Sequence, residues 1–332
     1  MASDSRFKTS QQMDKTMFQQ AKEFTTLMQT SAKKTFSGKI NIDHIARMVS
    51  DEVGEFFTPL KNFKNIALVD GKFNEDAWPQ DPKFYSNLFM QLIDGLSDAQ
   101  YYDLQHLSTT DIDGDAKLNK ICGAVTVLKN VSPPQDFHAY NEEFLAKAVA
   151  DPKFEKGKEG IWHLSNHIHE LYKNPKLYYD VSRNCFDVVA RLSDLIKAPF
   201  QQLQTQMLYT SEETKEKMAQ SHLCMVANII SQLILWLCTV PREGESPMFL
   251  NSRHIWNLIH AANMTKFGPG GRLEGEKWIK PADFKAPDAD IQKFIEDSLG
   301  EKTIMNHMKT LIRAYIDQLL FAMEQQKIKT SS

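Results

Sequence analysis

The sequence has 332 residues, of which 42% are hydrophobic and 24% charged, and its formal net charge is −3. Such a chain can bury a large core, which excludes disorder as the dominant state. Nucleic-acid binding is also disfavoured, because the lysine clusters are interrupted by apolar and acidic residues and form no concentrated basic face.

The four cysteines stand at positions 122, 185, 224 and 238 and form no CxxC pair. They predict neither a disulfide framework nor a zinc site. Reduced thiols are typical of the cytosol, and the polar residues 1–5 lack the apolar core of a signal peptide. The sequence therefore predicts a cytoplasmic protein. Its lysine-rich, arginine-poor composition would also suit a bacterial protein delivered into a host cell.

Two amphipathic helices are predicted at the start of the chain. Apolar residues step by three and four over residues 13–28 and again over residues 42–57, which is the spacing of one buried helix face. A loop or hinge is expected over residues 61–83, where Asp70-Gly71 and Pro79 interrupt the pattern. Its run 66–69 is the only strand-like segment of the sequence. The hinge would separate an N-terminal helical region, residues 1–60, which could form a small cap subdomain, from a main helical domain.

Helical patterns continue through the middle of the chain. Residues 84–96 and 97–107 predict two helices joined at Gly95, and further helices are expected over 117–128, 137–150 and 160–172. The stretch 177–208 is expected to be helical with a break at Pro199, because proline removes a backbone donor.

A long apolar helix is predicted next. Thr210 to Glu213 has the Thr-x-x-Glu form of a capping box, and the helix is expected to end at Pro241. Its segment Leu223–Val240 approaches the length of a membrane span but contains four polar residues. These interruptions favour a central core helix, so no membrane span is expected.

The last third of the chain predicts three more helices. Asn251 can cap a helix that reaches Met264, the glycine-rich run 268–271 predicts a turn, and Pro287-Asp288 opens a helix that ends near Gly300. A final apolar stripe over residues 305–323 predicts the last helix, and residues 327–332 are expected to fray. The predicted fold is all-α, a multi-helix bundle of about a dozen helices, with the main domain at residues 84–326.

Two motifs invite a metal interpretation. The run Asp111–Asp115 resembles the start of a calcium loop, but the sixth and twelfth places hold Ala116 and Cys122 instead of glycine and glutamate. His163 and His167 lie four residues apart on a predicted helix, with His169 nearby, a spacing that can hold zinc if a third ligand arrives from elsewhere. A helix-starting turn and ordinary histidines are the alternative interpretations. No other catalytic motif or cofactor signature is present in the sequence.

One resemblance to a known family lies late in the chain. A long apolar helix ends in LWLCTVP at Leu235–Pro241, and a second helix, IWNLIHAAN, occupies Ile255–Asn263 and is followed by Thr265–Gly268 (TKFG) and an amphipathic helix. This order resembles the Ras GTPase-activating protein domain and its IQGAP-like relatives. The resemblance implies an all-helical unit that grips a GTP-loaded small GTPase.

The sequence departs from that family at its motif positions. Pro241 and Asn263 are retained, but Leu237 stands where the family has its structural arginine, and Trp256 and Ile259 replace its lysine and glutamine. No arginine lies between positions 47 and 183, the interval in which the family carries its catalytic arginine finger. The resemblance therefore implies binding without conventional activation of hydrolysis. The partner-binding residues that it implies are Leu237, Pro241, Arg242, Arg253, Trp256, Asn263, Lys266 and Arg272.

Three functions remain open at this point. The first is a helical protein-interaction module that binds a small GTPase, the second is a helical adaptor for an unrelated protein, and the third is a metal-dependent enzyme that uses the cluster of His163, His167 and His169. The sequence favours binding over catalysis, and it predicts no cofactor.

Overall fold

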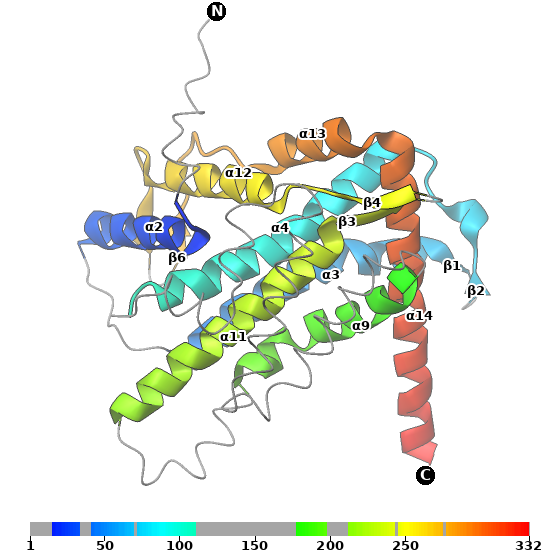
Figure 1. The fold of residues 1–332 in the computed structure, drawn as a ribbon, viewed down its shortest axis with the longest axis horizontal. Helices are drawn as coiled ribbons and strands as arrows, with labels where there is room; N and C mark the ends of the chain where they lie inside the picture. The colour runs from blue at the N-terminus through cyan, green and yellow to red at the C-terminus, as the bar shows by residue number, and fades with distance from the viewer. Residues whose placement is uncertain are drawn as a thin grey trace, which may run out of the picture.

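A computed structural model describes residues 15–33, 41–69, 72–110, 177–197, 212–242, 245–274 and 277–331. Helices account for 79% of the residues that can be interpreted, which confirms the helical class (Figure 1). The described residues do not support about a dozen helices. The helices expected over 117–128, 137–150 and 160–172 lie outside the described residues, as do Asp111–Asp115 and the three histidines.

The first described helix, α2 (Met17–Ala32), begins at a reciprocal cap. The side chain of Thr16 accepts a hydrogen bond from the Gln19 backbone N–H, and the Gln19 side chain accepts one from the Thr16 backbone N–H. The helix ends at Lys33, whose backbone is left-handed with φ of 50°. Its expected apolar stripe is buried at Met17, Ala21 and Phe24.

Helix α3 (Ile42–Ala67) is longer than the sequence predicted. Asn41 caps its start by accepting a hydrogen bond from the His44 backbone N–H, and the helix continues through Pro59. The expectation that a loop begins at residue 61 is wrong, because Leu60, Phe63 and Ala67 extend the buried stripe at helical spacing. A short hairpin, β1 (Leu68–Val69) with β2 (Lys72–Phe73), and a 3-10 turn, η1 (Glu75–Ala77), follow.

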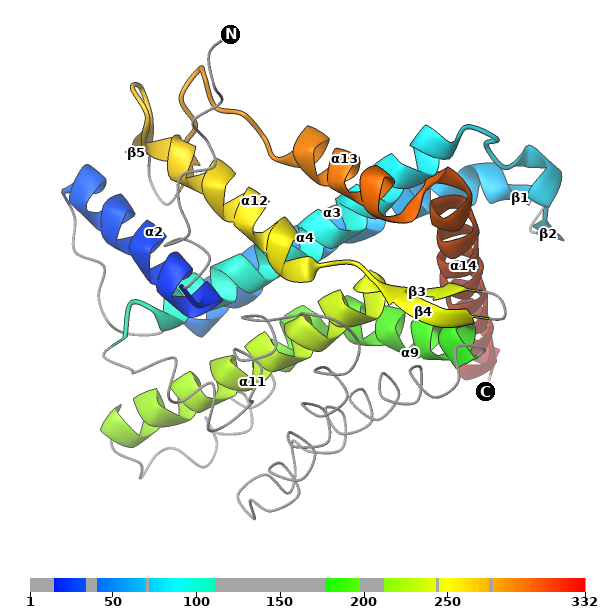
Figure 2. The ribbon, with the colours of Figure 1, turned by 45° about the horizontal axis from the view of Figure 1, so that its top comes forward.

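Helix α4 (Pro82–Leu107) is one continuous helix at the centre of the fold. It contacts α2, α3, α11, α13 and α14, and Figures 1 and 2 show it running through the middle of the described elements. The expectation of two helices joined at Gly95 is wrong. Gly95 lies inside the helix, where its missing side chain lets α3 approach: a Cβ there would lie 3.2 Å from the Phe56 Cβ and 3.3 Å from the Glu52 carbonyl oxygen.

Two further helices and a hairpin follow in the described residues. Helix α9 (Tyr178–Ala190) precedes α11 (Glu212–Cys238), and β3 (Thr239–Arg242) pairs antiparallel with β4 (Glu245–Phe249). The long helix therefore ends three residues before Pro241, which lies within β3. The capping box expected at Thr210 lies outside the described residues. Among the described residues, no helix is long and apolar enough to cross a membrane.

The last third follows the predicted order closely. Asn251 caps α12 (Ser252–Met264) by accepting a hydrogen bond from the His254 backbone N–H, and η5 (Thr265–Phe267) comes next. The glycine-rich turn has Gly270 at φ of 90°, and it leads into a hairpin that was not expected, β5 (Arg272–Glu274) with β6 (Lys277–Ile279). The described fold is therefore mostly helical with three two-stranded hairpins rather than purely α.

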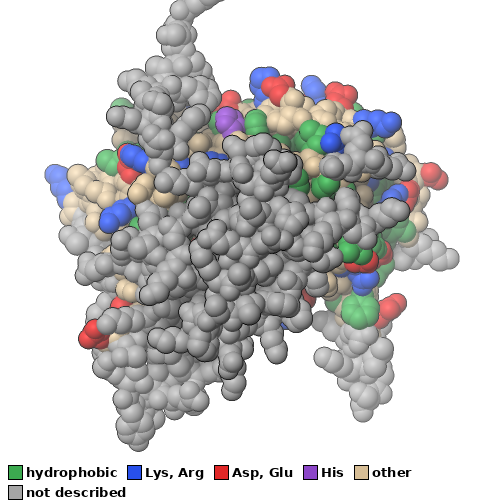
Figure 3. Space-filling model, viewed as in Figure 1, with side chains coloured by type: hydrophobic (Ala, Val, Ile, Leu, Met, Phe, Trp, Pro, Cys, Tyr) green, Lys and Arg blue, Asp and Glu red, His purple; other side chains and the backbone are tan. Residues whose placement is uncertain are grey.

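Helices α13 (Asp288–Leu299) and α14 (Glu301–Ser331) meet at Gly300 and close the described fold. Helix α14 packs on α4 and α9 and reaches Ser331, through residues that were expected to fray. Figure 3 shows basic and acidic side chains interspersed over the region of α13 at the top of this view.

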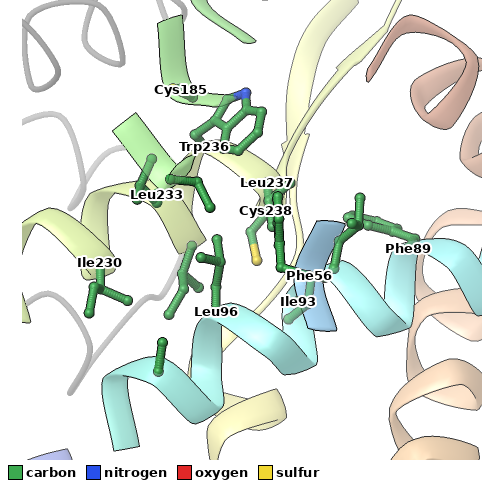
Figure 4. Packing of buried hydrophobic residues seen from close by; sticks show 14 of the residues in the cluster. Phe56, Phe89, Ile93, Leu96, Cys185, Ile230, Leu233, Trp236, Leu237 and Cys238 are labelled. Carbon is green, nitrogen blue, oxygen red and sulfur yellow. The ribbon is translucent and has the colours of Figure 1, made fainter. Parts of the chain in front are cut away.

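The core lies where α4, α9 and α11 converge (Figure 4). Trp236 is fully buried, its indole Nε1–H donates to Ser182 Oγ over 2.9 Å, and its carbonyl oxygen accepts from the Tyr178 hydroxyl at 3.2 Å. The segment Leu223–Val240 thus forms part of a protein core, as the sequence predicted. Buried aromatic rings of this size contribute much of the hydrophobic stabilisation of a helical fold.

Candidate functional site

The residues that the family resemblance implied as contacts do not form one surface. Leu237 is fully buried, and Trp256, Arg253 and Asn263 are buried as well. Their side chains are enclosed by the protein, so this conformation does not present them to a partner. The other four are at least partly accessible: Pro241, Arg242 and Lys266 are half-buried and Arg272 is exposed.

Trp256 and Arg253 hold the N-terminal helix α2 against α12. The Trp256 indole Nε1–H donates to Gln20 Oε1 at 2.7 Å, and Gln20 Nε2 donates to Asn257 Oδ1 at 3.2 Å. The Arg253 guanidinium donates to the Lys15 carbonyl oxygen. Figure 2 shows α2 and α12 side by side. We call these contacts the α2–α12 seam, and its polar groups stabilise the docking of α2.

His260 extends this seam toward α4. The Tyr101 hydroxyl and His260 Nδ1 are 2.9 Å apart, and the two rings stack. Glu23 Oε2 approaches His260 Nε2 only to 4.0 Å. Burial lowers the pKa of His260 to about 4, so the imidazole is neutral at pH 7. Since His260 is only 1% exposed, a substrate cannot reach it, and a structural role follows.

A second polar group lies where α3 and α4 pack together. We call Glu52, Asp94 and Asp98 the carboxylate cluster. Asp94 and Asp98 are one turn apart on the same face of α4. Glu52 lies across from them on α3, because its backbone packs directly against Gly95. The absence of a side chain at Gly95 therefore lets α3 approach α4 at Glu52, and the charges of Asp98 and Asp94 act on the Glu52 carboxyl group.

Burial and mutual repulsion disfavour the charged forms of these carboxyl groups. Desolvation, followed by the charges of Asp98 and Glu55, raises the pKa of Glu52 to about 8. Desolvation and the charge of Asp98 raise the pKa of Asp94 to about 8. Desolvation also raises the pKa of Asp98, to about 6, against the opposing attraction of Lys266. At pH 7 the cluster is therefore only partly ionised.

Two lysines and two aromatic rings border the carboxylate cluster. Lys266 of η5 is half-buried, and its Nζ lies 6.0 Å from the centroid of the Phe24 ring and 5.9 Å from that of Phe284. Lys280 Nζ lies 4.5 Å from the Phe284 centroid. Burial lowers the pKa of Lys266 while Asp98 opposes this shift. These cations lie near the carboxylates and on aromatic faces.

None of the three carboxylates has a partner within the described part of the chain. Glu52, Asp94 and Asp98 make no hydrogen bond there and no ion pair with a nitrogen within 4.0 Å. Within the same residues, no three His, Cys, Asp or Glu side chains converge as a metal site would require. The cluster is thus a set of acceptors that lies near cations without bonding to them.

The sequence carries a signal for one member of the cluster. Glu52 interrupts the apolar stripe between Val49 and Phe56, at a position that helical spacing assigns to the buried face. A carboxyl group on a buried face is unusual and often functional. Asp94 and Asp98 gave no comparable signal, because paired acidic residues on a helix are ordinarily solvated.

Comparisons with protein families, with curated protein sequences and with solved structures found no match to this chain. The resemblance to the Ras GTPase-activating protein domain therefore stays a prediction.

Proposed function

We propose that this chain is a helical protein-interaction module and that a partner binds at the carboxylate cluster. The observation that supports this proposal is the lack of bonding partners for Glu52, Asp94 and Asp98, although packing of α3 on α4 holds them together. Carboxyl groups that are held by packing and make no bond within the described residues can accept hydrogen bonds from another molecule.

Binding fits the described residues better than catalysis does. His260 and His307 are buried and neutral at pH 7, since burial lowers the pKa of each to about 4. Cys185 and Cys238 are fully enclosed, and burial raises the pKa of both thiols, so neither supplies a thiolate nucleophile. Acids, bases and nucleophiles do not converge at an accessible point among these groups.

The sequence suggests a small GTPase as the partner and the cytoplasm as the place of action. A module of this kind would bind the GTP-loaded form without accelerating hydrolysis, because the chain has no arginine between positions 47 and 183. An unrelated protein partner is an alternative that the same experiment addresses. Delivery into a host cell is a separate hypothesis from the composition.

The proposal is tested by affinity capture with the full chain as bait. Small GTPases loaded with GDP or with a non-hydrolysable GTP analogue are the prey, and a cell lysate is a second prey. We expect a protein partner to be retained by the wild type and lost in the double variant Asp94→Asn, Asp98→Asn. Asp297→Asn is the matched control, because Asp297 is exposed on α13 and paired with Lys293.

The outcomes separate the hypotheses. Capture of a GTPase in its GTP form alone supports the family resemblance, and equal capture of both forms or of neither contradicts it. Retention that is unchanged in the double variant contradicts the carboxylate cluster as the binding site. Stoichiometric zinc in the purified protein, lost in His163→Ala, would instead support the metal-dependent enzyme.

A further inference from the structure

We propose that the N-terminal ends of α2 and α12 together form a binding site for a phosphate group, carried by inorganic phosphate or by a small phosphate monoester. The site lies at the end of the α2–α12 seam opposite to Lys266, so it is separate from the carboxylate cluster and needs no protein partner. Two features support it: the buried guanidinium of Arg253, which has no anionic partner among the described residues, and the two helix N-termini that meet there.

Helices α2 and α12 run side by side in the same direction, so their N-termini lie at the same end of the seam (Figure 2). The contacts advance along both helices together, from Arg253 with Lys15 to Trp256 with Gln20. Each N-terminus carries a partial positive charge from the helix dipole. Neither helix has an acidic residue in its first turn that would neutralise this charge. The electrostatic field at this end of the seam therefore favours an anion.

Arg253 is the side chain that points to a ligand. It is 6% exposed, and its Nη2 donates to the Lys15 carbonyl oxygen, one residue before the N-cap of α2. Its Nε and Nη1 are buried without a hydrogen-bond partner, and no described carboxylate lies within 4.0 Å of the guanidinium. Burial lowers the pKa of Arg253 to about 10, so the group is still charged at pH 7. Because a buried cation without a counter-ion is costly, an anion that accepts from Nε and Nη1 would stabilise the fold.

The first turn of α12 supplies further unused donors. The Ser252 hydroxyl is buried and also lacks a partner within the described part of the chain. The Asn251 side chain caps the His254 backbone N–H, whereas the backbone N–H groups of Ser252 and Arg253 make no hydrogen bond to any described residue. A carboxylate has two oxygens, but phosphate presents more acceptors in a tetrahedral arrangement. Guanidinium, hydroxyl and backbone donors together therefore favour phosphate.

The buried position of these donors restricts the size of the ligand. Arg253 and Ser252 are enclosed, whereas the Lys15 side chain, directly before α2, is 41% exposed. Helix ends open locally at a small free-energy cost, so a brief opening at the start of α2 admits a small anion to the guanidinium. A phosphate group on a folded protein surface would need a much wider opening. The site therefore favours a free phosphate ion or a small monoester.

The test measures binding of inorganic phosphate to the full chain by isothermal titration calorimetry, with sodium chloride keeping the ionic strength constant. We expect saturable binding that weakens at least about tenfold in Arg253→Met, because charged hydrogen bonds are lost. Ser252→Ala should weaken binding by about three- to tenfold through loss of one donor. Arg191→Met is the matched control and should bind like the wild type, because Arg191 is exposed at the end of α9 and paired with Asp187.

Glycerol 3-phosphate, titrated in the same way, separates the two sources of the phosphate group. Tighter binding than that of inorganic phosphate assigns the site to a monoester, and weaker binding assigns it to the free ion.

Three results would overturn the proposal. The first is no saturable binding of either probe to a wild type that is folded by circular dichroism. The second is unchanged phosphate affinity in Arg253→Met, or in Ser252→Ala if Arg253→Met does not fold. The third is saturation by sodium acetate with the affinity of phosphate, which would indicate a site for any small anion.

Discussion

The α2–α12 seam and the carboxylate cluster are two polar regions packed against the same central helix, and they differ in how their polar groups are held. In the seam, hydrogen bonds join Trp256 to Gln20 and the Arg253 guanidinium to the Lys15 carbonyl oxygen, although Arg253 Nε and Nη1 are buried without a partner. In the cluster, Glu52, Asp94 and Asp98 make no hydrogen bond among the described residues, and their oxygens are not among the buried atoms that lack a partner. Hydrogen bonds therefore fix the geometry of the seam, whereas packing of α3 on α4 positions the carboxyl groups of the cluster.

The comparison predicts that damage to the seam costs stability. Trp256→Ala should destabilise the protein by about 3–5 kcal/mol, because it removes a buried ring stacked on Tyr101 and leaves Gln20 without its donor. Urea denaturation followed by circular dichroism measures the loss. Trp278→Ala is the control: its ring is only half-buried, so its cost should be smaller. An equal loss of stability in both variants would contradict a special contribution of the seam to stability.

Gly95 tests how closely α3 and α4 must pack to assemble the cluster. Gly95→Ala should cost about 1–3 kcal/mol, because the new Cβ would meet Phe56 and the Glu52 backbone at 3.2–3.3 Å. Gly54→Ala on α3 is the matched control, since nothing lies within 4 Å of its Cβ position. That substitution should stabilise the helix by up to about 1 kcal/mol. A neutral Gly95→Ala in thermal denaturation would contradict the close approach.

Removing a charge from the cluster should stabilise the protein, whereas damage to the seam should destabilise it. The pKa of Glu52 is raised from 4.5 to about 8 in the fold, so its contribution to stability is greatest below pH 4.5 and is lost as pH rises through 8. Glu52→Gln should therefore stabilise the protein by about 1–2 kcal/mol at pH 8.5. At pH 5 the gain should be close to zero.

Urea denaturation at the two pH values measures this difference. Asp297→Asn is the control, because Asp297 is exposed on α13 and its substitution should change stability by less than about 0.5 kcal/mol. A gain at pH 5 that equals the gain at pH 8.5 would mean that burial of charge does not explain the effect.

Local sequence signals predicted much of the described fold. The stripes of α2 and α3, the Asn251 cap and the turn at Gly270 follow from the chemistry of a few neighbouring residues. The errors arose where tertiary packing overrode a local sequence signal. Gly95 predicted a break between two helices, but α4 is continuous there. The missing side chain of Gly95 instead lets α3 pack closely against α4.

The candidate site was predicted less well than the fold. Motif alignment selected Trp256 and Asn263 as contacts, whereas their burial makes them part of the structural framework. Of the charged groups at the cluster, the sequence had selected only Lys266. Glu52, Asp94 and Asp98 lie on different helices or on a face that looks solvated in the sequence, so only the packing of α3 on α4 shows that they meet.

The sequence by itself determined the helical class, because apolar spacing and caps act over a few residues and need no tertiary information. It also determined that no helix among the described residues is apolar enough to cross a membrane. Tertiary structure alone decided which polar residues are satisfied and which are left without partners. That property depends on distances between segments far apart in the chain, such as Gln20 and Trp256 or Glu52 and Asp98, and no local pattern encodes those distances.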